Sequence, residues 1–187
     1  MRNPLIGIVF FVAFIGAAVA SQFCEWSVKV GQHATLKLNG IALSVDRPLA
    51  AKLSTADEAV FLPVEISHNK GSRAKWMVLR NSSRSRSDAG FCGAGHEDRL
   101  ILLQAQNGKV ASLGNFTAQS CLSSISMDVD QLDELTAAFH QDPKTGDLTF
   151  QQSVSSEISS SRRSVKIRVR DGKVRIETQI LDTDISE

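Results

Sequence analysis

The chain has 187 residues, with 21 basic and 20 acidic side chains and a formal net charge of +1. A dedicated nucleic-acid-binding protein is normally strongly basic, so the balanced charge argues against nucleic acid as a partner. Tyr is absent and there are two Trp, which argues against a sugar-binding face, since such faces usually present Tyr or Trp rings.

The first 20 residues have the layout of a secretory signal peptide. Arg2 precedes an apolar run from Leu5 to Ala20, and Ala18-Val19-Ala20 supplies the small residues that a signal peptidase recognises. The run is shorter than the about 20 residues of a membrane span. We therefore expect cleavage after Ala20 and export to the periplasm or the extracellular space. Residues 21–187 would then form a single domain that does not span the membrane.

The N-terminal part of the mature chain predicts a strand over Gln22–Val30 and then a tight hairpin. Asn39-Gly40 lies between two alternating apolar runs, which is typical of a type I′ turn. The register would place one apolar face and one wet face on the hairpin. The apolar pairs are Leu38 with Ile41, Leu36 with Leu43 and Ala34 with Val45. On the wet face, His33 would lie opposite Asp46 as a surface ion pair.

Four strands are expected in the middle of the chain, over Ala59–Ser67, Ala74–Arg80, Arg99–Ala105 and Lys109–Leu113. Pro63 indicates that the first of them lies at a sheet edge. Arg99–Ala105 is apolar on both faces, which is typical of a central, covered strand. Turns are expected at residues 68–71 and at Asn107-Gly108.

One short helix is expected near residues 131–140, with Asp130 as its N-cap. Asp133 and Glu134 lie in its first turn, where the helix dipole favours acidic groups. Leu132, Leu135 and Phe139 form its apolar stripe, and Asp142-Pro143 ends it. A strand over Leu148–Val154 follows, and the serine-rich residues 153–164 are interpreted as an exposed loop or a polar edge.

A second hairpin is expected around Asp171-Gly172. Its buried pairs are Val169 with Val174, Ile167 with Ile176 and Val165 with Thr178. Its outer face places Arg168 opposite Arg175 and Arg170 opposite Lys173, and like charges directly opposite are unfavourable. We therefore expect acidic groups nearby, from residues 128–147 or from a partner. Together these elements predict an α+β fold built on a mostly antiparallel sheet of hairpins and meanders.

Three cysteines remain after export, at positions 24, 92 and 121, and an oxidising compartment favours one disulfide and one leftover thiol. We predict a disulfide between Cys92 and Cys121, because they lie on the two arms of the Asn107-Gly108 hairpin. They are two residues out of register. A bulge at a neighbouring glycine could absorb that offset. Closing a loop of about 30 residues would stabilise the fold by roughly 3.6 kcal/mol in the chain-entropy model.

The segment Phe91–Asp98 is also the strongest candidate for chemistry. Cys92 as nucleophile with His96 as base, oriented by Glu97 or Asp98, would make a thiol hydrolase or transferase. Cys92, His96 and one of these acids could also ligate a metal, with His140 as a fourth ligand. The disulfide argues against both, because a paired cysteine is neither nucleophile nor ligand. The sequence therefore predicts no metal, no cofactor and no enzymatic activity.

Arginines supply the predicted binding residues. A first basic cluster in or beside the exposed run 81–90, where arginines alternate with serines, consists of Arg73, Lys75, Arg80, Arg84 and Arg86. Arg168 and Arg175 form a second cluster on the C-terminal hairpin. Guanidinium groups of this kind suit phosphate, sulfate or carboxylate, although such residues can also form an ordinary solvated surface.

Our leading hypothesis is an exported, non-catalytic binding or inhibitory module. It would present residues 82–95, pinned by the disulfide, to a protein or an anionic component of the cell envelope, with Arg84, Arg86 and Asp88 in contact. The thiol enzyme is the first alternative. The second is a structural subunit of an envelope assembly, in which Cys24 or an edge strand pairs chains.

Overall fold

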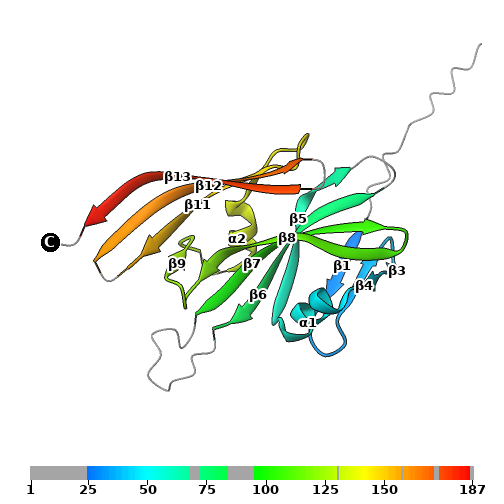
Figure 1. Cartoon of the computed structure of the whole chain (residues 1–187). Coiled ribbons are helices and arrows are strands. Elements are labelled where there is room, and N and C mark those ends of the chain that lie inside the picture. The colour runs from blue at the N-terminus through cyan, green and yellow to red at the C-terminus, as the bar shows by residue number, and fades with distance from the viewer. Residues whose placement is uncertain are drawn as a thin grey trace, which may run out of the picture.

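The computed structural model describes residues 25–67, 72–83, 95–129, 131–156, 158–170 and 173–185. The predicted signal peptide, Cys24 and Cys92 lie outside these residues. The described chain is predominantly antiparallel β-sheet with two short helices (Figure 1). The dominance of the sheet is as predicted, whereas the expectation of one helix is wrong.

The N-terminal hairpin forms as expected near its turn. β1 (Trp26–Lys29), β2 (Thr35–Leu38) and β3 (Ile41–Ala42) make a three-stranded sheet, with Leu38 opposite Ile41. Asn39 and Gly40 have φ of 52° and 77°, the left-handed values that a type I′ turn requires. The chain then leaves the hairpin, because β4 (Ser44–Val45) pairs in parallel with β8 (Lys109–Ser120). The predicted pair of Ala34 with Val45 is therefore not formed.

The helix that was not predicted is α1 (Arg47–Thr55). It has clear sequence signals, but the apolar alternation of the preceding hairpin concealed them. The Asp46 side chain accepts a hydrogen bond of 2.8 Å from Leu49 N, which is an N-cap. Pro48 lies in the first turn, where its missing N–H costs nothing. The predicted ion pair of His33 with Asp46 is wrong, because that carboxylate caps the helix instead.

Four long strands form a central meander: β5 (Glu58–Ser67), β6 (Arg73–Ser82), β7 (His96–Gln106) and β8 (Lys109–Ser120). β5 lies at the end of the sheet order, as Pro63 predicted. β7 is covered on both faces, as its apolar sequence predicted. Leu100 and Leu102 belong to one hydrophobic core, and Ile101 and Leu103 belong to the other, which α1 and the N-terminal hairpin cover.

The sheet continues from β8 through β9 (Ile125–Ser126) to β11 (Leu148–Ser155), β12 (Ser159–Arg170) and β13 (Lys173–Ile185). Residues of β11 and β12 share one core with residues of β5 to β8, so the sheet folds back over itself. Between its two halves lies α2 (Leu132–Ala138), which buries Leu135 in that core (Figure 1).

The helix predicted near 131–140 is therefore present, with Asp133 and Glu134 in its first turn, although its N-cap is Gln131 and not Asp130 as expected. It ends earlier than expected, because His140 and Gln141 form β10, which pairs with β11. Most of the serine-rich residues 153–164 are strand rather than an exposed loop or a polar edge. Residues 153–155 end β11 and residues 159–164 begin β12, Ser155 lies opposite Ser160, and β12 has a neighbour on each side.

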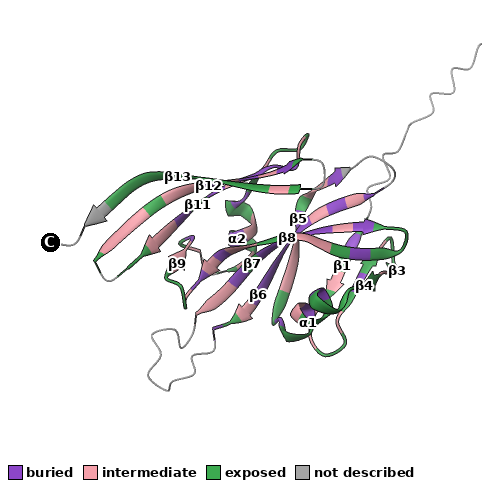
Figure 2. Cartoon of the chain, in the orientation of Figure 1, coloured by how far each residue is buried: buried purple, intermediate pink, exposed green. Residues whose placement is uncertain are grey.

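The C-terminal hairpin has the predicted register. Val169 lies opposite Val174, Ile167 opposite Ile176 and Arg168 opposite Arg175. The β12 side of this face is buried, as expected. Ile176 on β13 is nevertheless 47% exposed, because β13 is the last strand of the sheet and has a strand neighbour on one side. Figure 2 shows the change from buried to exposed positions across these strands.

Candidate functional site

The candidate site is the end of the β6–β7 hairpin, from which residues 84–94 extend. Arg84, Arg86, Asp88 and Cys92 lie outside the described residues. The two strands stay paired up to Ser82 opposite His96, and Ser83 N donates a hydrogen bond of 2.8 Å to Gly95 O. The two ends of the segment are therefore held about 5 Å apart, the spacing of paired strands.

A buried ion pair fixes this end of the hairpin. Arg80 and Asp98 lie opposite each other on β6 and β7. Arg80 Nε is 2.7 Å from Asp98 Oδ1, and Arg80 Nη2 is 2.8 Å from Asp98 Oδ2. The two side chains are 5% and 0% exposed, so the expectation that Arg80 belongs to an exposed basic cluster is wrong. A bidentate pair of this kind fixes geometry as well as charge.

Two further carboxylates tie the end of β6 to its surroundings. Glu97 Oε1 accepts hydrogen bonds from Ser83 Oγ at 2.7 Å and from Leu122 N at 3.1 Å. Asp57 Oδ2 accepts from the backbone N and the Oγ of Ser82, at 2.6 and 2.8 Å. Glu97 and Asp98 are thus engaged in holding the hairpin, which leaves neither in the predicted role of orienting His96.

Cys121 lies directly beside the two ends of the segment. It is disulfide-bonded, and its N donates to His96 O at 3.2 Å. A Cβ at position 95 would stand 2.7 Å from Cys121 Sγ, so the sulfur packs against a site that a glycine alone fits. The other two cysteines, Cys24 and Cys92, lie outside the described residues.

The bulges in the β7–β8 hairpin do not reduce the register offset between Cys121 and position 92, as was expected, but increase it. Leu102 lies opposite Gly114 and Asp98 opposite Gln119, so β8 carries the two extra residues. These bulges bring Cys121 level with His96 and increase its offset from position 92 from two residues to four.

The structure places His96 at the first position of β7, half-buried. Its Nδ1 is buried and has no hydrogen-bond partner within the described ranges. His140 lies on β10, in the other half of the sheet. No group of three His, Cys, Asp or Glu side chains in the described chain could hold a metal ion.

A groove of about 550 Å³ runs beside the hairpin end. Most of its lining residues carry polar side chains, and Asn81 Nδ2 donates to Thr55 O at 2.8 Å. Its two carboxylates, on Asp57 and Glu97, already accept hydrogen bonds within the chain. The lining residues are Gly31, Gln32, Ser54, Thr55, Ala56, Asp57, Asn81, Ser82, Glu97 and Leu122.

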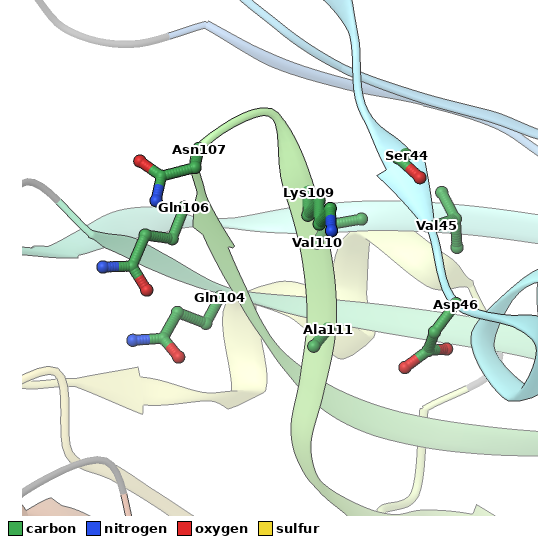
Figure 3. Close-up of a pocket in the computed structure, with 9 residues that line it drawn as sticks. All are labelled: Ser44, Val45, Asp46, Gln104, Gln106, Asn107, Lys109, Val110 and Ala111. Carbon is green, nitrogen blue, oxygen red and sulfur yellow. The ribbon is translucent and has the colours of Figure 1, made fainter.

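A second cavity of about 510 Å³ lies where β4 meets β8 (Figure 3). Gln104 and Gln106 point to one side of β8, whereas Val45 and Asp46 lie on the other side. Asp46 caps α1, and Gln104 Nε2 donates to Ser72 Oγ at 3.2 Å. These side chains do not converge on one point, and we assign no function to this cavity.

The second predicted cluster lies on β12 and β13. Arg168 Nη2 is 3.0 Å from Glu177 Oε2. Arg170 forms a bidentate pair with Asp147 at 2.8 and 2.9 Å, which confirms that residues 128–147 supply an acidic neighbour. Burial raises the pKa of Asp147, but hydrogen bonds from Arg170 and from Val169 N outweigh it, so this pKa lies below its usual value. Arg175 forms no ion pair with the described residues.

In comparisons with known proteins, no family model, curated protein or solved structure gives a significant match to this chain. Neither helix in the described ranges is long and apolar enough to cross a membrane.

Proposed function

We propose that the protein is an exported, non-catalytic binding module that presents residues 84–94 to a protein or an anionic component of the cell envelope. The observation that carries this proposal is the anchoring of both ends of the segment. The Arg80–Asp98 pair, the Glu97 and Asp57 contacts and the disulfide-bonded Cys121 all lie at this point. A segment held at both ends loses less conformational entropy on binding than a free one.

Two positions support Cys92 as the partner of Cys121. Cys92 is three residues from Gly95, a chain length of about 10 Å at most, and Gly95 packs against Cys121. Cys24 instead precedes Glu25, whose O accepts from Asn39 N. Gly31 lines the same groove as Leu122, the residue that follows Cys121. Glu25 precedes the opposite end of β1 and therefore lies at the end away from Cys121. A disulfide to Cys92 would pin the segment and remove the nucleophile of the alternative thiol enzyme.

Arg84 and Arg86 give the segment its proposed chemistry. Their guanidinium groups would make bidentate hydrogen bonds to phosphate, sulfate or carboxylate oxygens of the partner. Asp88 would add one acceptor. The polar groove beside the hairpin end offers further contacts to a partner that covers it.

The test uses a photo-reactive amino acid introduced in place of Ser87 in the exported protein. We expect a discrete cross-linked product in intact cells, lost when Arg84 and Arg86 are both replaced by Ala. The matched control replaces Arg99 and Lys37, which are exposed on β7 and β2, and should leave the product unchanged. A product that persists in R84A/R86A would show that these arginines are not the binding residues.

A further inference from the structure

The outer edge of β13 is the largest unpaired strand edge in the described chain. β13 has 13 residues and pairs with β12 on one side. Its side chains from 173 to 183 are exposed, apart from half-buried Val174 (Figure 2). A long open edge invites pairing with another strand, and proteins usually shorten, cover or interrupt such edges.

β13 is also rich in exposed apolar side chains. Ile176, Ile180 and Leu181 are 47%, 66% and 45% exposed. Half of the large hydrophobic side chains exposed in the described chain lie on this one strand. Concentration of apolar surface on one element marks a contact surface.

We propose that two copies of the chain pair through β13, antiparallel, about a two-fold axis at Thr178. Directly opposed residues of an antiparallel pair face the same side of the sheet. The axis must therefore pass through a residue that faces its own copy. This requirement leaves few possible registers, and the sequence of β13 discriminates among them.

A bulge in β13 changes how residues are counted in this register. Ile180 lies opposite Arg163 and Asp182 opposite Arg162, so Leu181 is an extra residue. The bulge belongs to the strand itself and is therefore also present at its free edge. With Ile180 and Leu181 counted as one position, Ile176 faces Ile180 of the second copy, and Arg175 faces Asp182 of the second copy.

The charges of the strand favour this arrangement. Arg175 lies opposite Arg168 within the chain, and Arg168 is paired with Glu177. No ion pair links Arg175 or Asp182 to the described residues. Asp182 lies opposite Arg162 within the chain, without an ion pair. The second copy would add an oppositely charged neighbour to both Arg175 and Asp182, and symmetry makes this pair twice in the dimer.

The neighbouring registers are unfavourable. An axis at Gln179 would place Glu177 opposite Asp182 of the second copy. An axis at Glu177 would place that residue opposite its own copy. Like charges directly opposite destabilise a strand pair, so the register at Thr178 is favoured over both neighbouring registers.

The test is sedimentation equilibrium of the purified protein at low salt, from about 1 to about 100 µM, the range in which a weak dimer dissociates. We expect a dimer in the native protein. Arg175→Asp and Asp182→Arg should each raise its dissociation constant about tenfold or more, because two opposed pairs become repulsive. The double variant R175D/D182R should restore dimerisation, since it exchanges the charges without removing the pair.

Asp133→Arg is the matched control, since it makes the same charge change on α2, and it should leave the dimer unchanged. Thermal unfolding of each variant shows that the β12–β13 hairpin is intact. A monomer throughout the concentration range would overturn the proposal, as would a double variant that dimerises no better than the single ones. Neither outcome affects the binding role of residues 84–94, which is measured with other variants.

Discussion

Arg80 and Asp98 face each other across β6 and β7 and form a bidentate ion pair from which water is excluded, with separations of 2.7 and 2.8 Å. The pair lies two residues before Ser82 and two residues after His96, the last opposed positions of the hairpin. It therefore sets the geometry from which residues 84–94 extend.

Replacing Arg80 by Met should lower the free energy of unfolding by about 3–5 kcal/mol, because Asp98 is left as an uncompensated buried charge. Chemical denaturation at neutral pH measures this loss. The control is Arg73→Met, which breaks a less buried ion pair with Glu65, whose partners are 38% and 17% exposed. It should cost clearly less, because Arg73 is partly solvated and Glu65 keeps the hydrogen bond from Trp26 Nε1. Equal losses in the two variants would contradict the structural role of the Arg80–Asp98 pair.

Gly95→Ala should destabilise the protein by about 1–3 kcal/mol, because the new Cβ meets the Cys121 Sγ at 2.7 Å and the sulfur is held by its disulfide. Gly114→Ala is the comparison. Its Cβ would stand 3.0 Å from Val174 Cγ2, a side chain on a strand with an open edge that can move. Denaturation curves should therefore rank G95A as the less stable variant, and the reverse order would contradict the packing at Cys121.

Asp46→Ala should cost about 0.5–2 kcal/mol of stability, because Leu49 N loses the acceptor that caps α1. Asp133→Ala on α2 serves as control, since the Asp133 side chain makes no hydrogen bond or ion pair with the described residues. A thermal melt of both variants tests the assignment, which fails if they lose the same stability.

Asp147→Asn should change the dependence of stability on pH. The pKa of Asp147 is lower in the folded protein than its usual value. This carboxylate therefore contributes stability above the unfolded pKa, and the contribution is lost as the pH falls through the folded pKa. We expect D147N to be less stable than the native protein at neutral pH and equally stable once both forms of residue 147 are uncharged. A constant difference over the whole acid range would contradict this prediction.

The sequence predicted those parts of the fold that depend on local pattern. Asn39-Gly40 gave the register of the first hairpin, and the pairs around residues 171–172 were correct from Val165 to Thr178. The alternation of β5 to β8 was equally informative, since a strand buried on one or both faces has a readable apolar period.

Asp46 was interpreted as a strand residue because the apolar alternation continued to Val45. Its capping role, although a local signal, was therefore missed.

Features that depend on distant neighbours could not be predicted from the local pattern. The Arg80–Asp98 pair depends on the β6–β7 register, and the bulges after Leu102 and Asp98 depend on how the sheet bends. The spacing of these residues along the chain indicates neither the ion pair nor the bulges.

The central claim is that residues 84–94 are a pinned binding segment and not the site of a reactive thiol. Alkylation of the protein purified without reductant, followed by intact mass and peptide mapping, tests it most directly. We expect one alkylated cysteine, Cys24, and a peptide in which Cys92 is joined to Cys121. An alkylated Cys92, with Cys121 joined to Cys24, would rule out the disulfide-anchored segment and favour the thiol enzyme.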